Sequence, residues 1–137
     1  QKSLWASWVV KSGNRSFYFS GDSGYAKHYK EIGDKHGPME VVFMDSGQYN
    51  TRWREVHNMP EEVIKGFIDL KGENLIPIHW GMFTLAMHNW FDPPVEIKKR
   101  AEEKSISLIT PIIGQVIDMK NLIDTESWWE KFINVIK

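Results

Sequence analysis

Three short apolar runs, each ending in a polar loop, constrain the fold of this sequence more than any other feature. The runs and their loops are Phe17–Phe19 before Gly21–Gly24, Val41–Phe43 before Asp45–Gly47, and Leu75–Ile78 before His79–Gly81. Apolar runs of this length, bounded by glycine and polar residues, are typical of buried strands. An open α/β sheet places its ligand crevice beyond the carboxyl ends of such strands. If the three strands are neighbours in one sheet, Asp22, Asp45 and His79 therefore lie at the same edge.

Helical segments alternate with these runs. Helical pattern and stop signals predict helices over Tyr25–His36 and over Val95–Lys104. A third helix is predicted to start at Asn58, which would act as its cap together with Glu61 three residues later. Further strands are predicted at Leu4–Lys11, paired as a hairpin with Ser16–Ser20, and at Ile106–Thr110 and Gln115–Asp118. A last amphipathic helix over 120–137 is capped by Asp124 or Thr125, and one side of it carries Trp128, Trp129, Phe132, Ile133 and Ile136. The alternation predicts a single α/β region over 1–137, with helices covering a sheet.

Composition excludes several classes of partner and site. The 137 residues have a formal net charge of −1 and no block of Lys or Arg, so the basic surface of a nucleic-acid-binding protein is absent. No apolar run is long enough to span a membrane and no leader pattern can be read, so we expect an intracellular, cytoplasmic protein. The sequence has no cysteine, which leaves His, Asp and Glu as the strong metal ligands.

The shared edge of the expected sheet is suited to a metal ion. A carboxylate from Asp22 and an imidazole from His79 are ligand types of a zinc site, and the flanking glycines let loop backbone pass close to an ion. Asp22 also fits a simple turn between glycines, and we interpret Asp45 as a turn cap rather than a ligand. Two ligands are fewer than a stable zinc site uses, so the residues alone indicate a site without completing it.

Five blocks of sequence, taken in order, resemble one known family. They are Leu4–Trp8, Phe19–Tyr25, Gly47–Trp53, His57–Glu62 and Ile78–Phe83, followed by Pro93-Pro94. Their order and spacing are similar to the metallo-β-lactamase superfamily, and within it to the branch of N-acyl-phosphatidylethanolamine phospholipase D, across about Leu4–Gly114. The resemblance implies an α/β fold that is the carboxyl-terminal half of an αββα sandwich: a mixed sheet with helices on one outer face.

The same resemblance implies a site and a reaction. Asp22 corresponds to the aspartate that bridges two zinc ions, and His79 to the histidine that completes the second ion. These two are the expected metal-binding and catalytic residues, and the candidates for substrate contacts or for support of the ligands are Tyr49, Arg52, His57 and His88. The implied reaction is hydrolysis of a phosphodiester or lactone by water that the ions activate. The implied substrate is a small-molecule or lipid-like ester.

One departure from the family is large. Its His-x-His-x-Asp-His motif, which supplies most of the ligands, is absent from these 137 residues. We therefore expect partial or no metal binding by this chain alone. We also expect a partner that covers an apolar sheet face, either the missing amino-terminal half of the domain or a second copy of the chain. The alternative function is a non-catalytic interaction or scaffold module that keeps half of the fold.

Overall fold

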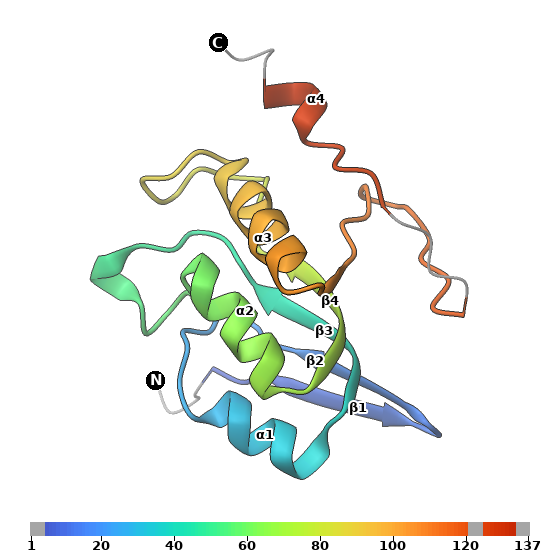
Figure 1. Cartoon of the computed structure of the whole chain (residues 1–137). Helices are drawn as coiled ribbons and strands as arrows, with labels where there is room; N and C mark the ends of the chain where they lie inside the picture. Colours follow the sequence, from blue (N-terminus) through green and yellow to red (C-terminus); the bar gives the residue numbers. More distant parts are fainter. Residues whose placement is uncertain (1–4, 121–124, 134–137) are drawn as a thin grey trace.

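A five-stranded sheet organises the chain, as Figure 1 shows for the computed structural model, which describes residues 5–120 and 125–133. The strands are β1 (Trp8–Ser12), β2 (Arg15–Phe19), β3 (Met39–Asp45), β4 (Gly72–Ile78) and β5 (Ser107–Leu108), and their order in the sheet is β1-β2-β3-β4-β5. β1 runs antiparallel to β2, and the other neighbours pair in parallel. The predicted mixed sheet and its amino-terminal hairpin are confirmed, although Leu4 lies outside the described residues.

Three helices lie on one face of this sheet (Figure 1): α1 (His28–His36), α2 (Pro60–Asp69) and α3 (Asp92–Glu103). Between helices and sheet lies the main core, whose fully buried members include Tyr18, Tyr29, Val42, Leu75 and Ile97. Burial of large apolar side chains is the main favourable term in folding, so this layer holds the strands in place. Among the described residues, no helix is both long and apolar enough to cross a membrane.

The helices begin at other residues than the sequence predicts. α1 starts at His28 rather than Tyr25, and α3 starts at Asp92, with two prolines in its first turn. Proline is tolerated there because its missing N–H would have no partner within the helix. α2 is preceded by Met59, whose backbone N–H donates to the Glu62 carboxylate at 2.9 Å, so Asn58 and Glu61 do not form the expected cap.

The carboxyl-terminal part differs most from the prediction. Gln115–Asp118 is not a strand; instead Ile117 and Met119 pack on the second face of the sheet, against a small cluster around Ile76. Within the described part of the predicted 120–137 helix, helical structure is confined to α4 (Glu130–Ile133), and residues 125–129 are not helical. Asp124 and Ile136 lie outside the described residues.

The second face of the sheet carries an apolar row that no helix among the described residues covers (Figure 1). The strand register places Trp8 beside Phe19, Phe19 beside Phe43, and Phe43 beside Ile76. Trp8 is 65% exposed and Phe19 is 44% exposed, whereas Ile76 is buried. The apolar row is therefore most exposed at β1 and is buried at β4.

Gly33 tests how closely the helical layer is packed. A β-carbon at Gly33 would overlap the carbonyl oxygen of Asp69 where α1 crosses the end of α2. Gly33→Ala should therefore lower the free energy of unfolding by about 2 kcal/mol, because overpacking forces the two helices apart. The measurement is urea unfolding, with the exposed Lys35→Ala of the same helix as control. A Gly33→Ala protein as stable as the control would contradict this packing.

Candidate metal centre

Parallel pairing brings the carboxyl ends of β2, β3 and β4 to one edge of the sheet. Asp22 lies just beyond β2, Asp45 is the last residue of β3, and His79 follows β4 directly. The polar residues that follow the three apolar runs therefore converge, as the sequence predicts. The site occupies the edge at which α/β sheets place their ligands.

Asp22 and His79 face each other at this edge. Oδ1 of Asp22 lies 3.9 Å from Nδ1 of His79, and the side chains are 54% and 35% exposed. His79 adopts φ 65°, in the left-handed region that is strained for a residue with a β-carbon. Its carbonyl lies so close to Gly47 that any side chain at position 47 would overlap it. The turn after β4 is thus held tightly against the loop after β3.

His57 joins this pair from an irregular segment. It follows the short 3-10 helix η1 (Thr51–Trp53), and its ring stacks on that of His79 with 5.0 Å between centroids and 23° between planes. One potential ligand atom from each of Asp22, His57 and His79 lies within 4.8 Å of the others. The sequence indicates His57 only as a substrate or supporting residue, because no local pattern in its loop places it beside His79.

Asp45 lies beneath this cluster of three. Its side chain is fully buried, and its Oδ2 lies 2.8 Å from Nδ1 of His57 and accepts the backbone N–H of Ser23 at 3.0 Å. Burial raises the pKa of the Asp45 carboxyl, and the hydrogen bonds from His57 and Ser23 oppose that rise. The interpretation of Asp45 as the cap of its own turn is wrong, because its carboxylate binds residues from two other segments.

Two further candidates, Tyr49 and His88, contact each other. Their rings stack with 4.3 Å between centroids and 26° between planes. Burial raises the pKa of the Tyr49 hydroxyl to about 12, so this phenol stays neutral at physiological pH. Tyr49 follows β3 and His88 follows β4, so the stack ties the two loops together. Their roles toward substrate stay predictions.

Gln48 fastens the same two loops by hydrogen bonds. Its buried side chain donates Nε2–H to the carbonyl of Phe83 at 2.6 Å and accepts the N–H groups of Leu85 at 3.0 Å and Ala86 at 3.1 Å. The loop held in this way displays exposed apolar side chains, among them Met82, Phe83, Leu85 and Met87. The buried Gln48 side chain, which we call the Gln48 clamp, therefore holds in place an apolar, solvent-exposed loop next to His79.

Arg52, the remaining candidate, is exposed in η1. Its backbone N–H donates to the side-chain oxygen of Asn50 at 3.0 Å, which caps η1. The neighbouring Trp53 donates its indole N–H to the carbonyl of Gln48 at 2.8 Å. The expected role of Arg52 in substrate contacts or in support of the ligands stays a prediction.

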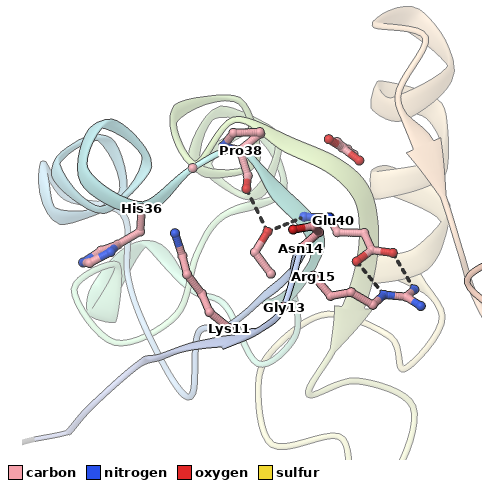
Figure 2. A pocket seen from close by; sticks show the side chains of 10 residues that line it. Lys11, Gly13, Asn14, Arg15, His36, Pro38 and Glu40 are labelled. Carbon is pink, nitrogen blue, oxygen red and sulfur yellow. Dashed lines mark hydrogen bonds and ion pairs between the residues drawn. The ribbon is translucent and has the colours of Figure 1, made fainter.

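Two cavities lie at opposite ends of the sheet. A groove of about 490 Å³ begins at His79 and is lined mainly by apolar side chains, including Phe43, Ile78 and Trp128. A second hollow of about 410 Å³ lies at the amino ends of β2 and β3, where Arg15 donates two hydrogen bonds to Glu40 (Figure 2). The apolar groove adjoins the candidate ligands, whereas the hollow of Figure 2 lies at the other end of the strands and its lining includes the Arg15–Glu40 ion pair.

Comparisons with known proteins agree with this geometry. Residues 1–80 match the family described as the Beta-lactamase superfamily domain. An uncharacterised protein of Mycobacterium tuberculosis is 36% identical over 129 residues, covering 92% of this chain and 35% of the relative. The N-acyl-phosphatidylethanolamine-hydrolyzing phospholipase D 1 of Caenorhabditis elegans is 31% identical over 121 residues, covering 82% of this chain and 34% of that protein. The chain thus spans about a third of the length of these relatives.

Solved structures agree on the fold. Igni18, a metallo hydrolase from Ignicoccus hospitalis, superposes with a TM-score of 0.59 at 18% sequence identity, over 78% of this chain and 42% of that protein. Similarity at this level of identity shows the architecture and not the activity. The strand-end cluster therefore has to be interpreted from its own residues.

The Gln48 clamp generates a test. Gln48→Ala removes three hydrogen bonds to the loop over 83–86, each of which contributes roughly 1 kcal/mol net, so the loop should open more often. Chymotrypsin cleavage after Phe83 or Leu85 should accelerate about tenfold or more, followed by mass spectrometry. Gln115→Ala is the matched control, since this glutamine also accepts a backbone N–H but in another loop. Equal cleavage of both variants would show that Gln48 does not hold the loop.

Proposed function

The chain belongs to the metallo-β-lactamase superfamily, and we propose from this that the protein containing it is a metal-dependent hydrolase of phosphodiester or lactone-type esters. One observation carries the proposal: a carboxylate and two imidazoles, from Asp22, His57 and His79, cluster where the strands end. The alternation of strands and helices accounts for the fold but does not require a cluster of this kind. The carboxylate and the two imidazoles of the cluster are the groups that support hydrolytic chemistry.

The donor set fits a divalent cation. Imidazole nitrogen and carboxylate oxygen bind Zn²⁺ at about 2.0–2.2 Å, and catalytic zinc sites use about three protein ligands with a further position left open. Mn²⁺ and Fe²⁺ accept the same donors, so we propose zinc from the resemblance rather than from the ligands. For the complete protein we propose two ions, with the further ligands supplied by sequence outside these 137 residues.

The chain's own residues have separable tasks in this proposal. A divalent ion, when bound, supplies Lewis-acid activation of water and of the substrate oxygen. Asp22 and His79 would hold it, since both lie in loops that follow parallel strands and both are open to solvent. Nδ1 of His57 is engaged by Asp45, so Nε2 is the atom that His57 can offer to the reacting groups.

The apolar groove and loop indicate the class of ester. The groove of about 490 Å³ begins at His79 and could seat an apolar portion of a substrate, with the scissile ester at the cluster. The clamped loop with Phe83 and Met87 adds apolar surface beside the turn after β4. We therefore propose a lipid-like or otherwise partly apolar ester, in keeping with the substrate named for the Caenorhabditis elegans relative.

A second function is favoured by one observation. The uncovered row that includes Trp8 and Phe19 suits a non-catalytic module that binds another surface. Metal analysis distinguishes the two proposals, because a binding module requires no ion at the strand ends. Bound metal at stoichiometric amounts together with hydrolytic turnover in the full-length protein would contradict the binding module.

Substitution of the ligands tests the hydrolase proposal. In the full-length protein, Asp22→Ala and His79→Ala should each lower bound metal, and turnover should fall at least about 100-fold with it, because the ion loses a direct ligand. Bound metal is measured by elemental analysis and turnover with a chromogenic phosphodiester. His36→Ala, at the distant hollow of Figure 2, is the control. Normal metal content and activity in both ligand variants would end the proposal.

The uncovered sheet face generates a separate prediction about partners. We propose that either the rest of the domain or a second copy covers it, so the 137-residue chain by itself should self-associate and bind an apolar dye. Sedimentation and dye fluorescence measure this, and Trp8→Ser combined with Phe19→Ser should reduce both signals. Ile68→Ser, exposed on the helical side, is the matched control. A monomer that binds no dye would count against both kinds of partner.

A further inference from the structure

Asp45 is the innermost member of a chain of polar groups. The exposed fractions of the side chains rise outward from 0% for Asp45 and 13% for His57 to 35% for His79 and 54% for Asp22. A buried ionised carboxylate costs several kcal/mol unless it is well paired, and Oδ1 of Asp45 is buried without a hydrogen-bond partner among the described residues. An aspartate retained at this depth is therefore poorly explained by stability alone.

The Asp45 carboxylate determines which nitrogen of His57 is available. When the carboxylate is ionised it only accepts hydrogen bonds, and Nδ1 of His57 is then the donor in the 2.8 Å contact with Oδ2. In neutral imidazole the other nitrogen then carries a free lone pair. Nε2 is the ring nitrogen that Asp45 does not contact, so it is the one that remains available beside Asp22 and His79.

Asp45 also contacts the neighbours of every member of the cluster. Its Oδ2 accepts the N–H of Ser23, which is next to Asp22. Its register partner on β4 is Ile78, which is next to His79. Three separate chain segments are thus tied to one residue at the end of β3.

The segment that carries His57 is tied to Asp45 a second time. Asn58 is fully buried and donates its side-chain N–H to the backbone carbonyl of Asp45 at 3.1 Å and to the hydroxyl of Tyr29 at 3.0 Å. The backbone beside His57 therefore cannot move without breaking buried hydrogen bonds, each of which is costly to leave unmade. The side chain of Asp45 holds His57 directly, and the backbone carbonyl of Asp45 holds it through Asn58.

We propose that Asp45 is a positioning residue that aligns Asp22, His57 and His79 and holds His57 as the Nδ1–H tautomer, with Nε2 directed to the reaction. Only one part of this assignment rests on the proposed function, namely the role of Nε2 of His57 in the reaction. The hydrogen-bond geometry holds whatever the substrate is. Carboxylate partners of this kind fix both the tautomer and the orientation of functional histidines in other sites.

The tautomer is tested first, in metal-free full-length protein at a pH where the ¹⁵N spectra themselves show a neutral imidazole. Long-range ¹H–¹⁵N spectra, with the His57 signals assigned from His57→Gln, should show Nδ1 protonated and Nε2 unprotonated. Asp45→Ala should lose this pattern, whereas Asp45→Asn should keep it because its amide oxygen can still accept. An Nε2–H tautomer in the unsubstituted protein would overturn the assignment without any variant.

Kinetics then test the consequence for the reaction. With bis(p-nitrophenyl) phosphate as the probe, Asp45→Ala should lower kcat about 10- to 100-fold while KM changes little, and Asp45→Asn should recover much of the loss. Glu40→Gln is the matched control, since it removes a carboxylate at the other end of β3 (Figure 2). An Asp45→Ala protein with the original tautomer and kcat, or a Glu40→Gln protein with the same loss, would refute the role.

The two proposals fail in different ways. If Asp22→Ala and His79→Ala leave metal and turnover unchanged, the hydrolase is wrong, yet the tautomer of His57 still reports on Asp45. If the tautomer is not Nδ1–H, the positioning role is wrong even where the ligand variants abolish activity. The spectrum and the metal content are therefore read separately.

Discussion

The parallel register of β2, β3 and β4 is the constraint on which the rest of the structure depends. Parallel neighbours point their carboxyl ends the same way, so polar residues that follow separate strands are delivered to one edge. Asp22 and His79 are far apart in sequence and become neighbours only through that pairing. The helical layer protects the pairing by burying the face that carries Val42 and Leu75.

A buried carboxylate converts this shared edge into an ordered site. Parallel strands alone would place loops near one another but leave their side chains free to rotate. Asp45 removes much of that freedom, because Nδ1 of His57 and the N–H of Ser23 both contact its Oδ2 from different segments. Burying the charge is unfavourable for stability, and the same low-dielectric surroundings strengthen the hydrogen bonds it makes. Burial of the Asp45 carboxylate thus both orders the site and lowers the stability of the fold.

The two faces of the sheet are covered differently. One is sealed by α1, α2 and α3, while the other carries the row from Trp8 to Ile76 and the groove that begins at His79. The chain spans about a third of its curated relatives, and the proposed second set of ligands is attributed to the remainder of the protein. The loop that Gln48 holds follows the turn that carries His79. The groove that adjoins the candidate ligands therefore lies on the same face of the sheet as the uncovered apolar row.

Local patterns were sufficient to predict the sheet and to place Asp22 and His79 at one edge of it. Asp22 and His79 could be placed there because each stands in the polar loop that follows an apolar run, and strand ends are set by hydrophobic pattern and turn residues. The resemblance of five ordered blocks supplied the family, which the match over residues 1–80 shows. The same local reasoning failed for Gln115–Asp118, because a strand requires a neighbour with free backbone groups and not only β-forming residues.

Tertiary structure alone decided the rest. His57 reaches His79 from an irregular loop, and no periodicity encodes the path of a loop. Asp45 looked like a turn residue because the sequence reveals that a carboxylate ends a strand but not what surrounds it. Burial and hydrogen-bond partners depend on which segments pack together, and here Ser23, His57 and Ile78 arrive from three different parts of the chain. The sequence by itself determined which groups stand at the strand ends, and packing determined which of them the buried carboxylate holds.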